Sequence, residues 1–511
     1  MTSETLILLS LLAPTVGALL VSLTGSAPNL RESISTLATL VTFGAVAPLT
    51  PRVLAGQRPR LDVMEVLPGV DLAFEVEPLG MLYALVASGL WIITSLYAIG
   101  YMRGHNEQNQ TRFFVCFALA ISAALGIAFS ANLFTLFLFY EVLTFSTFPL
   151  VTHHGTEKAK QAGRIYLGIL VTTSVCFLLL AVVWTFQLTG SLEFRPGGIL
   201  AGKASGSTLT ALMVLYAFGA GKAALMPFHR WLPNAMVAPT PVSALLHAVA
   251  VVKAGVFTIL KVIVYVFGIE TIAAGGHSDW LMWVASGTLL LASLVAITQD
   301  NLKARLAYST ISQLSYIVLG GALATAEGVL GGGMHIVMHA VGKITLFFCA
   351  GAIYVAAHKT EISTMNGLAR RMPFTMTAFT IGSLSIIGLP PFGGTWGKWY
   401  LGLGAARGDN HLFIFVLMLS SLLSIGYLMP VVLRAFFRPP DPESNSHHGE
   451  HADEDSGSQH ASHKGGRHEG IQEAPLLCVG PLCAAAVGCL VLFFTSDQIL
   501  QLLLPITTGA R

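Results

Sequence analysis

Apolar runs of helical length recur along nearly the whole chain, separated by short polar segments. Because a helix needs about 20 apolar residues to cross the hydrocarbon core of a bilayer, each run predicts a transmembrane span. The expected fold is therefore an all-α polytopic membrane protein. We predict fourteen spans, at residues 5–23, 32–50, 79–102, 112–130, 132–152, 164–188, 207–227, 241–265, 280–298, 305–324, 329–356, 374–403, 411–433 and 475–495.

Two of these spans carry helix-breaking residues in their interiors. Span 7 meets Pro227 and continues as the short piece 228–237, and span 12 meets Pro390 and Pro391 followed by two glycines. Broken helix at membrane depth is tolerated only where protein or water satisfies the freed backbone groups. The pattern is typical of the discontinuous helices of transporters.

Composition agrees with this pattern and narrows the function. The chain has 511 residues, of which 54% are hydrophobic and 11% charged, and its mean hydropathy is +0.70. Soluble domains carry about 25% charged residues. The six cysteines lie in apolar stretches without metal-ligand spacing, and no Fe–S cysteine set, Gly-rich nucleotide loop or haem motif is visible. We expect no cofactor and no metal, and so no redox chemistry by this chain alone; the net charge of +2 gives no indication of nucleic acid.

The distribution of basic residues predicts the orientation. If both termini face outside, the inside loops hold more than twice as many Lys and Arg as the outside segments. Inside loops are the ones enriched in Lys and Arg. We therefore expect a multi-pass protein of the cell inner (plasma) membrane with both termini outside. The first span, 5–23, has no basic segment in front of it and is expected to be a span, not a cleaved signal peptide.

One long hydrophilic segment, residues 439–474, interrupts the apolar pattern and is rich in histidine. Weak metal binding or pH sensing is one interpretation, and a disordered linker of biased composition is the other. No fixed ligand spacing is visible, which favours the linker. The orientation places this loop inside.

Ionisable residues inside the predicted spans are the main candidates for function, because charge at membrane depth is energetically costly. Glu141 is the one acidic residue predicted in the middle of a span. Lys222 precedes the break in span 7, and a buried Lys readily changes its protonation state. We predict that these two exchange a proton. Lys261 lies near the end of span 8 and is expected to snorkel toward the interface, so it is not a candidate.

The other candidates lie on spans 8, 11 and 12. On span 11, three ionisable residues recur every four positions and so share one helical face. A metal site is disfavoured there because no carboxylate accompanies the histidines. The column fits a hydrated proton relay. The candidates beyond Glu141 and Lys222 are His247, Lys253, His335, His339, Lys343 and Lys398.

These stretches resemble a known family. GAGKAALMPFHRWLPNAMVAPTPVSALLHAVAVVKAGVF, QDNLKARLAYSTISQLSYI and MHIVMHAVGKITLFFCAGAI are similar to segments of the antiporter-like subunits of respiratory complex I, of Mrp-type cation/proton antiporters and of membrane-bound hydrogenases. FLFYEVLTFSTFPLV resembles the segment that carries the family's essential glutamate. The likeness covers most of spans 3 to 14.

The resemblance implies a fold with two inverted five-helix repeats and discontinuous helices 7 and 12. Glu141 and Lys222 match the family's ion pair, the ionisable residues of spans 8 and 11 match its central hydrophilic axis, and Lys398 matches the terminal lysine of that axis. The expected divisions are 1–110 (spans 1–3), 111–270 (first repeat), 271–438 (second repeat), 439–474 (the hydrophilic loop) and 475–511 (span 14 and tail).

Within the family, GLPPFGGTWGKWYL, YLMPVVLRAFF and EAPLLCVGPLCAAAVGCLVLFF look most like the D-type subunit of Mrp antiporters. One complex I type has a glutamate at the position of Lys398, and another has a long C-terminal lateral helix that is not expected here. The resemblance thus implies a proton-translocating subunit of a sodium/proton antiporter, with other subunits, protons and Na⁺ as partners. Two alternatives stay open: the pumping subunit of a complex I-like or hydrogenase complex, and a pump subunit of an inorganic-carbon uptake system. Neighbouring genes would discriminate between them.

Overall fold

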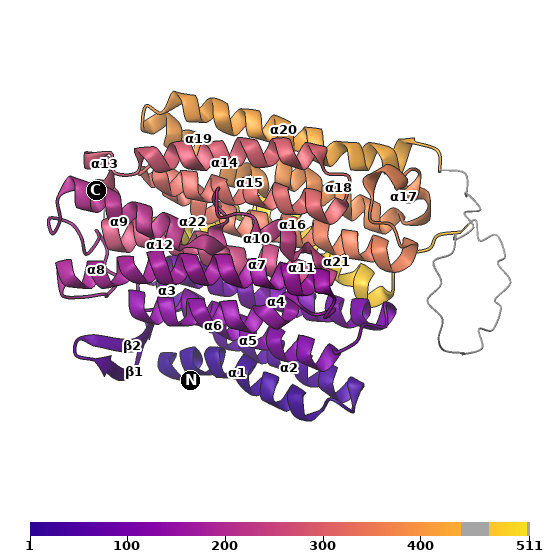
Figure 1. The fold of residues 1–511 in the computed structure, drawn as a ribbon, viewed down its shortest axis with the longest axis horizontal. Helices are drawn as coiled ribbons and strands as arrows, with labels where there is room; N and C mark the ends of the chain where they lie inside the picture. The colour runs from indigo at the N-terminus through magenta and orange to yellow at the C-terminus, as the bar shows by residue number, and fades with distance from the viewer. Residues whose placement is uncertain (441–469, 508–511) are drawn as a thin grey trace.

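The computed structural model describes residues 1–440 and 470–507, and helices occupy all fourteen predicted spans. The histidine-rich part of the hydrophilic loop lies outside the described residues, so its interpretation as a linker stays a prediction. The helices lie side by side with their axes roughly parallel, with α1 and α2 at one edge and α20 at the other (Figure 1). The long helices outside the two breaks are α1 (Ser3–Leu23), α2 (Pro28–Val46), α4 (Pro78–Gly104), α5 (Gln110–Ala128), α6 (Leu133–Val151), α7 (Glu157–Thr173), α8 (Leu180–Thr189), α14 (Asp279–Thr298), α15 (Leu302–Ala322), α16 (Ala326–Ala357), α20 (His411–Phe437) and α21 (Leu476–Phe494).

Eleven helical segments among the described residues are long and apolar enough to cross a membrane. The chain is thus a polytopic all-α membrane protein, as predicted. The remaining three spans are α9 (Gly206–Gly219), α15, and α18 (Pro373–Ile387) with α19 (Gly394–Arg407). The first and third are shortened by the breaks, and α15 carries a polar face that lowers its hydropathy.

The centre of the molecule is formed by α16 and by span 8, which consists of α11 (Thr240–Ala244), a π-helical turn at 245–249, α12 (Val251–Val262) and a second π-helical turn. The most hydropathic windows of both segments are wholly buried by other helices. They nevertheless contain most of the candidate site residues. Charged groups are therefore surrounded by protein and kept away from lipid, as their desolvation requires.

Several short elements were not predicted. A β-hairpin of β1 (Arg60–Leu67) and β2 (Val70–Glu75) follows the five-residue helix α3 (Thr50–Leu54), and the amphipathic helix α22 (Ser496–Leu503) follows span 14. The apolar pattern predicted no element at residues 51–78, because the strands there are short and partly polar. Helix α22 contacts α3, and Arg52 of α3 contacts Ser3 at the start of α1. The start of the chain and α22 therefore lie at the same end of the bundle, as an even number of crossings requires.

Candidate functional site: a row of buried lysines and histidines

Lys222 lies in the break of span 7. Helix α9 ends at Gly219 and a single 3₁₀ turn at 221–223 carries the lysine. The Lys222 ammonium is fully buried and donates hydrogen bonds to the Tyr140 carbonyl oxygen at 2.8 Å and to Thr144 Oγ1 at 2.6 Å. It also lies 3.2 Å from the centre of the Tyr140 ring, so a cation–π contact adds to the two hydrogen bonds.

Neighbouring side chains satisfy the backbone groups that the break exposes. Trp231 Nε1 donates to the Gly221 carbonyl at 3.1 Å, and the Met226 amide donates to Thr288 Oγ1 at 3.2 Å. Ala224 takes a left-handed conformation with φ +55°. The Gly221 carbonyl and the Met226 amide at the break are thus paired with other parts of the protein. Broken helix inside a membrane requires such pairing.

Glu141 does not contact Lys222 directly. It is half-buried on α6, directly after Tyr140, and its Oε1 atom is buried without a hydrogen-bond partner among the described residues. Lys222 is held instead by two neutral oxygens on the same helix. The structure therefore places Lys222 against α6, the helix that carries Glu141, but the predicted ion pair between the two residues is not formed.

Lys253 and His339 form the centre of the site. The Lys253 ammonium on α12 donates to Nδ1 of His339 on α16, and both side chains are buried. His247 is also fully buried and packs against Phe347, with ring centres 4.7 Å apart and the rings tilted. Neither ring nitrogen of His247, nor Nε2 of His339, has a partner among the described residues.

From His339 the row continues toward Lys398. The rings of His335 and His339 are stacked with centres 6.0 Å apart, as their four-residue spacing predicts. His335 Nε2 donates to Gln313 Oε1 at 3.0 Å. The ring of Tyr316 bridges the next step, with its centre 5.3 Å from that of His335 and 4.8 Å from the Lys398 ammonium.

Lys343 extends from the same helix toward α15. Its ammonium donates to Ser309 Oγ at 2.6 Å and to the Leu306 carbonyl at 3.1 Å. Ser309 in turn donates to the hydroxyl of Tyr427 on α20, at 3.0 Å. Lys343 is therefore buried and held by two neutral acceptors, as Lys222 is at the first break.

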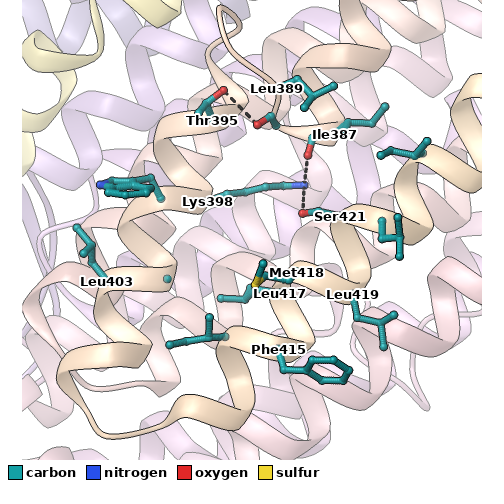
Figure 2. Close-up of a pocket in the computed structure, with 16 residues that line it drawn as sticks. Ile387, Leu389, Thr395, Lys398, Leu403, Phe415, Leu417, Met418, Leu419 and Ser421 are labelled. Carbon is teal, nitrogen blue, oxygen red and sulfur yellow. Dashed lines mark hydrogen bonds between the residues drawn. The ribbon is translucent and has the colours of Figure 1, made fainter.

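Lys398 ends the row beside the second break. Its ammonium donates to the carbonyl of Ile387, the last residue of α18, at 2.9 Å and to Ser421 Oγ at 3.0 Å (Figure 2). An apolar groove of about 820 Å³ between α18, α19 and α20 opens beside it. Trp399 and Phe415 on this groove are largely exposed. Lys398 is thus the member of the row that is open to the side of the molecule.

Lys261 does not snorkel, contrary to the prediction. Its side chain is fully buried and its ammonium lies 3.4 Å from Glu77 Oε1. Glu77 also accepts hydrogen bonds from the amides of Leu79 and Gly80 at the start of α4 and from the hydroxyl of Tyr265. The pair fixes the start of α4 against span 8. The sequence suggested an interface position because Lys261 lies near the end of span 8, and the partner Glu77 precedes a different span.

The sequence also missed the polar side chains between the charged residues. Ser309, Gln313 and Tyr316 lie on one face of α15, and Tyr140 and Thr144 hold Lys222 from α6. A signal was available for α15, since spacings of four and three residues place polar groups on one helical face. No comparable sequence pattern indicated that the Tyr140 carbonyl would accept a hydrogen bond from Lys222.

The arrangement can carry protons. Ammonium groups and imidazoles follow one another across the buried centre, and a neutral imidazole both accepts and donates. Buried polar atoms are normally satisfied by protein or by ordered water. The unpartnered ring nitrogens of His247, His335 and His339 therefore call for water molecules between the side chains. Among the described residues, no group of His, Cys, Asp or Glu is arranged to hold a metal ion.

Comparison with known proteins agrees with this chemistry. Residues 130–424 match the family described as NADH:quinone oxidoreductase/Mrp antiporter, transmembrane. Subunit N of the NADH-quinone oxidoreductase of Desulforudis audaxviator is 34% identical over 420 residues, which cover 81% of this chain and 82% of that protein. Chain 5 of the NAD(P)H-quinone oxidoreductase of Synechocystis is 31% identical over 397 residues, and the matched region spans 56% of that longer protein.

Two solved structures share the fold. A chain of the Mrp complex from Dietzia sp. superposes with a TM-score of 0.85 at 22% identity and covers 100% of this chain and 98% of its own length. A chain of the membrane-bound sulfane sulfur reductase, described as an archaeal respiratory membrane complex, superposes with a TM-score of 0.82 at 23% identity and coverages of 99% and 97%. The fold is thus that of subunits found in multisubunit membrane complexes.

Proposed function

Because the chain belongs to the NADH:quinone oxidoreductase/Mrp antiporter transmembrane family, we propose that it is the proton-translocating subunit of a multisubunit antiporter that exchanges protons for Na⁺. One observation carries the proposal: a buried row of titratable side chains runs from Lys222 to Lys398 through Lys253 and His339. Protons move along this row, and Glu141 controls the charge at its first member.

The two breaks support an organisation in two repeats, 111–270 and 271–438. In each half a lysine lies beside a broken helix and donates to a backbone carbonyl, Lys222 to that of Tyr140 and Lys398 to that of Ile387. The proposed setting is a plasma membrane with both termini outside, in a complex with other subunits.

A second function has its own support. The 34% identical relative is a subunit of an NADH-quinone oxidoreductase. The same row of residues would then pump protons at the expense of electron transfer in partner subunits. Both functions use this chain for proton movement and differ in the energy source.

Purification of the intact complex decides between them. We expect small antiporter subunits to copurify, and addition of Na⁺ to inside-out vesicles to collapse a preformed pH gradient. Copurification of flavin and Fe–S subunits, with acidification of the vesicles on donor oxidation and no response to Na⁺, would establish the pump and overturn the antiporter.

A further inference from the structure

A polar cavity of about 390 Å³ lies at the end of the bundle where α4 and α16 finish and α11 and α15 begin. The Lys and Arg count assigns this end to the inside. The cavity is separate from the groove beside Lys398, and none of the eight candidate site residues lines it. The side chains that line it and enter the argument are Tyr101, His105, Glu107, His154, Thr240 and Lys303.

Glu107 is the centre of a titratable cluster at the rim. Its side chain is only 6% exposed, although it lies in the loop between α4 and α5. Nδ1 of His105 lies 3.1 Å from one carboxylate oxygen, and Nδ1 of His154 lies 3.7 Å from the other. Nε2 of His153 lies 3.9 Å from that second oxygen. Three imidazoles thus surround one buried carboxylate at the rim of the cavity.

The charge around this carboxylate is otherwise positive. Lys158, Lys303 and Lys359 line the cavity, and the Lys303 ammonium donates to the Ala238 carbonyl at 2.6 Å. The neutral hydroxyls of Tyr101 and Tyr354 complete the titratable lining. Without Glu107 the cavity would repel hydronium, since the charges lining a cleft determine which ions it concentrates.

The floor of the cavity leads to the buried row. Thr240 lines the cavity at the start of α11, and Ser243 and His247 follow at helical spacings of three and four residues. Ser243 and His247 are fully buried. The Ser243 hydroxyl and both ring nitrogens of His247 have no partner among the described residues. Two buried residues with unpartnered polar atoms, Ser243 and His247, thus follow Thr240 along the helix from the cavity wall. Buried polar atoms of this kind call for water molecules.

We propose that this cavity is the aqueous mouth through which the relay exchanges protons with the inner side, with Glu107 as the proton-collecting carboxylate and Ser243 as the step inward to His247. The inference rests on the proposed proton translocation by this chain. The occupant of the cavity is water.

Glu107→Gln in the complete complex tests the collecting role. In inside-out vesicles we expect the initial proton flux to fall about tenfold at pH 8, within the range of electrostatic focusing, and less at pH 6.5, where protons are more abundant. Addition of imidazole as a mobile proton carrier should restore most of the flux. The matched control is Glu157→Gln, an exposed acid on the same end of the molecule, which should behave as wild type.

Ser243→Ala provides the second variant, because it removes a hydroxyl without a protein partner and should leave folding intact. We expect a reduced flux that imidazole does not restore, since the defect lies inside the protein. Ser286→Ala, which removes another buried and unpartnered hydroxyl on α14, should transport normally. Wild-type flux and pH dependence in both Glu107→Gln and Ser243→Ala would overturn the inference. Absence of proton flux in the wild-type complex would instead refute the proposed function.

Discussion

The Lys222 ammonium binds a backbone carbonyl oxygen next to an acidic residue. The ammonium donates to the carbonyl of Tyr140, while the carboxylate of the next residue, Glu141, keeps one oxygen buried and unpaired. An ammonium that moves between neutral oxygens and a carboxylate changes its affinity for the proton, because an opposite charge favours the charged form. In this structure the Lys222 ammonium is hydrogen-bonded to neutral oxygens only.

Substitution of either residue should abolish proton-coupled transport. Lys222→Ala removes the carrier, Lys222→Arg keeps the charge but cannot release a proton at working pH, and Glu141→Ala removes the acid that controls it. We expect at least about a hundredfold loss of dye-monitored proton flux in each, as loss of a positioned proton-transfer group entails. Lys160→Ala, at an exposed lysine, is the control. Normal flux in both alanine variants, with the complex assembled, would refute the assignment.

Lys261 is predicted to serve stability and not transport. Lys261→Met would leave the Glu77 carboxylate buried without its cation, and breaking a buried pair on one side typically costs about 3–5 kcal/mol. Thermal denaturation of the purified complex should therefore occur at a clearly lower temperature, while the complex that remains folded transports protons. Lys160→Met, which breaks the exposed pair with Glu157, should change stability by less than about 1 kcal/mol. Loss of transport without loss of stability would place Lys261 in the relay instead.

His153, in the loop after α6, makes the fold sensitive to acid. Burial, with added repulsion from His154 and Arg112, lowers the pKa of His153 to about 4. An unfolded chain, in which the histidine pKa is about 6.5, therefore binds more protons between those values. Stability should fall as pH drops from about 6.5 toward 4, by up to about tenfold in the folding equilibrium constant per pH unit. His153→Asn should flatten this dependence in thermal denaturation scans; an unchanged slope would contradict it.

At the scale of elements, the break in span 7 depends on close packing by α12. A Cβ atom added at Gly255 would lie 2.1 Å from the backbone nitrogen of Ala223, beside Lys222. No side chain fits there unless the break moves. The glycine therefore holds the 3₁₀ turn and its lysine against the helix that carries Lys253.

Gly255→Val should consequently disturb both stability and transport. Overpacking of this kind costs about 1–3 kcal/mol, and the displaced lysine should lose its hydrogen bonds to α6. The matched control is Gly287→Ala on α14, where an added Cβ meets no atom within 4 Å and helix propensity should improve slightly. The measurement is thermal stability together with proton flux; wild-type values for Gly255→Val would show that the close packing is dispensable.

Most elements and fewer of their contacts could be predicted from the sequence. Apolar runs specify helices strongly, because the bilayer leaves the backbone no other way to pair. The prolines of spans 7 and 12 indicated both breaks, but α9 ends at Gly219, so the first break begins before Pro227 and contains Lys222. The hydrogen-bond partners of individual side chains were harder to predict. The capping of α4 by Glu77 and the retention of Lys222 by a tyrosine carbonyl depend on which helices become neighbours. The hairpin β1–β2 was missed because short, partly polar strands carry little periodic signal.

At the scale of the whole molecule, the buried row lies on α12, α16 and α19 and against α6, and each of these helices packs against the next in the order α6, α12, α16 and α19. It is closed to lipid at its centre, where Lys253 and His339 are buried, and open beside Lys398, where the apolar groove begins. The inferred cavity near Glu107 adds a branch toward the inner side, joining at His247.

Lys253 donates to His339 at the centre of the row, so its substitution tests the account most directly. The measurement is the initial rate of pH change, reported by an impermeant dye, in liposomes that contain the purified complex with Lys253→Ala. We expect no proton flux above that of protein-free liposomes, while subunit composition and thermal stability match those of wild type. Proton flux at the wild-type rate would show that the buried row does not conduct protons.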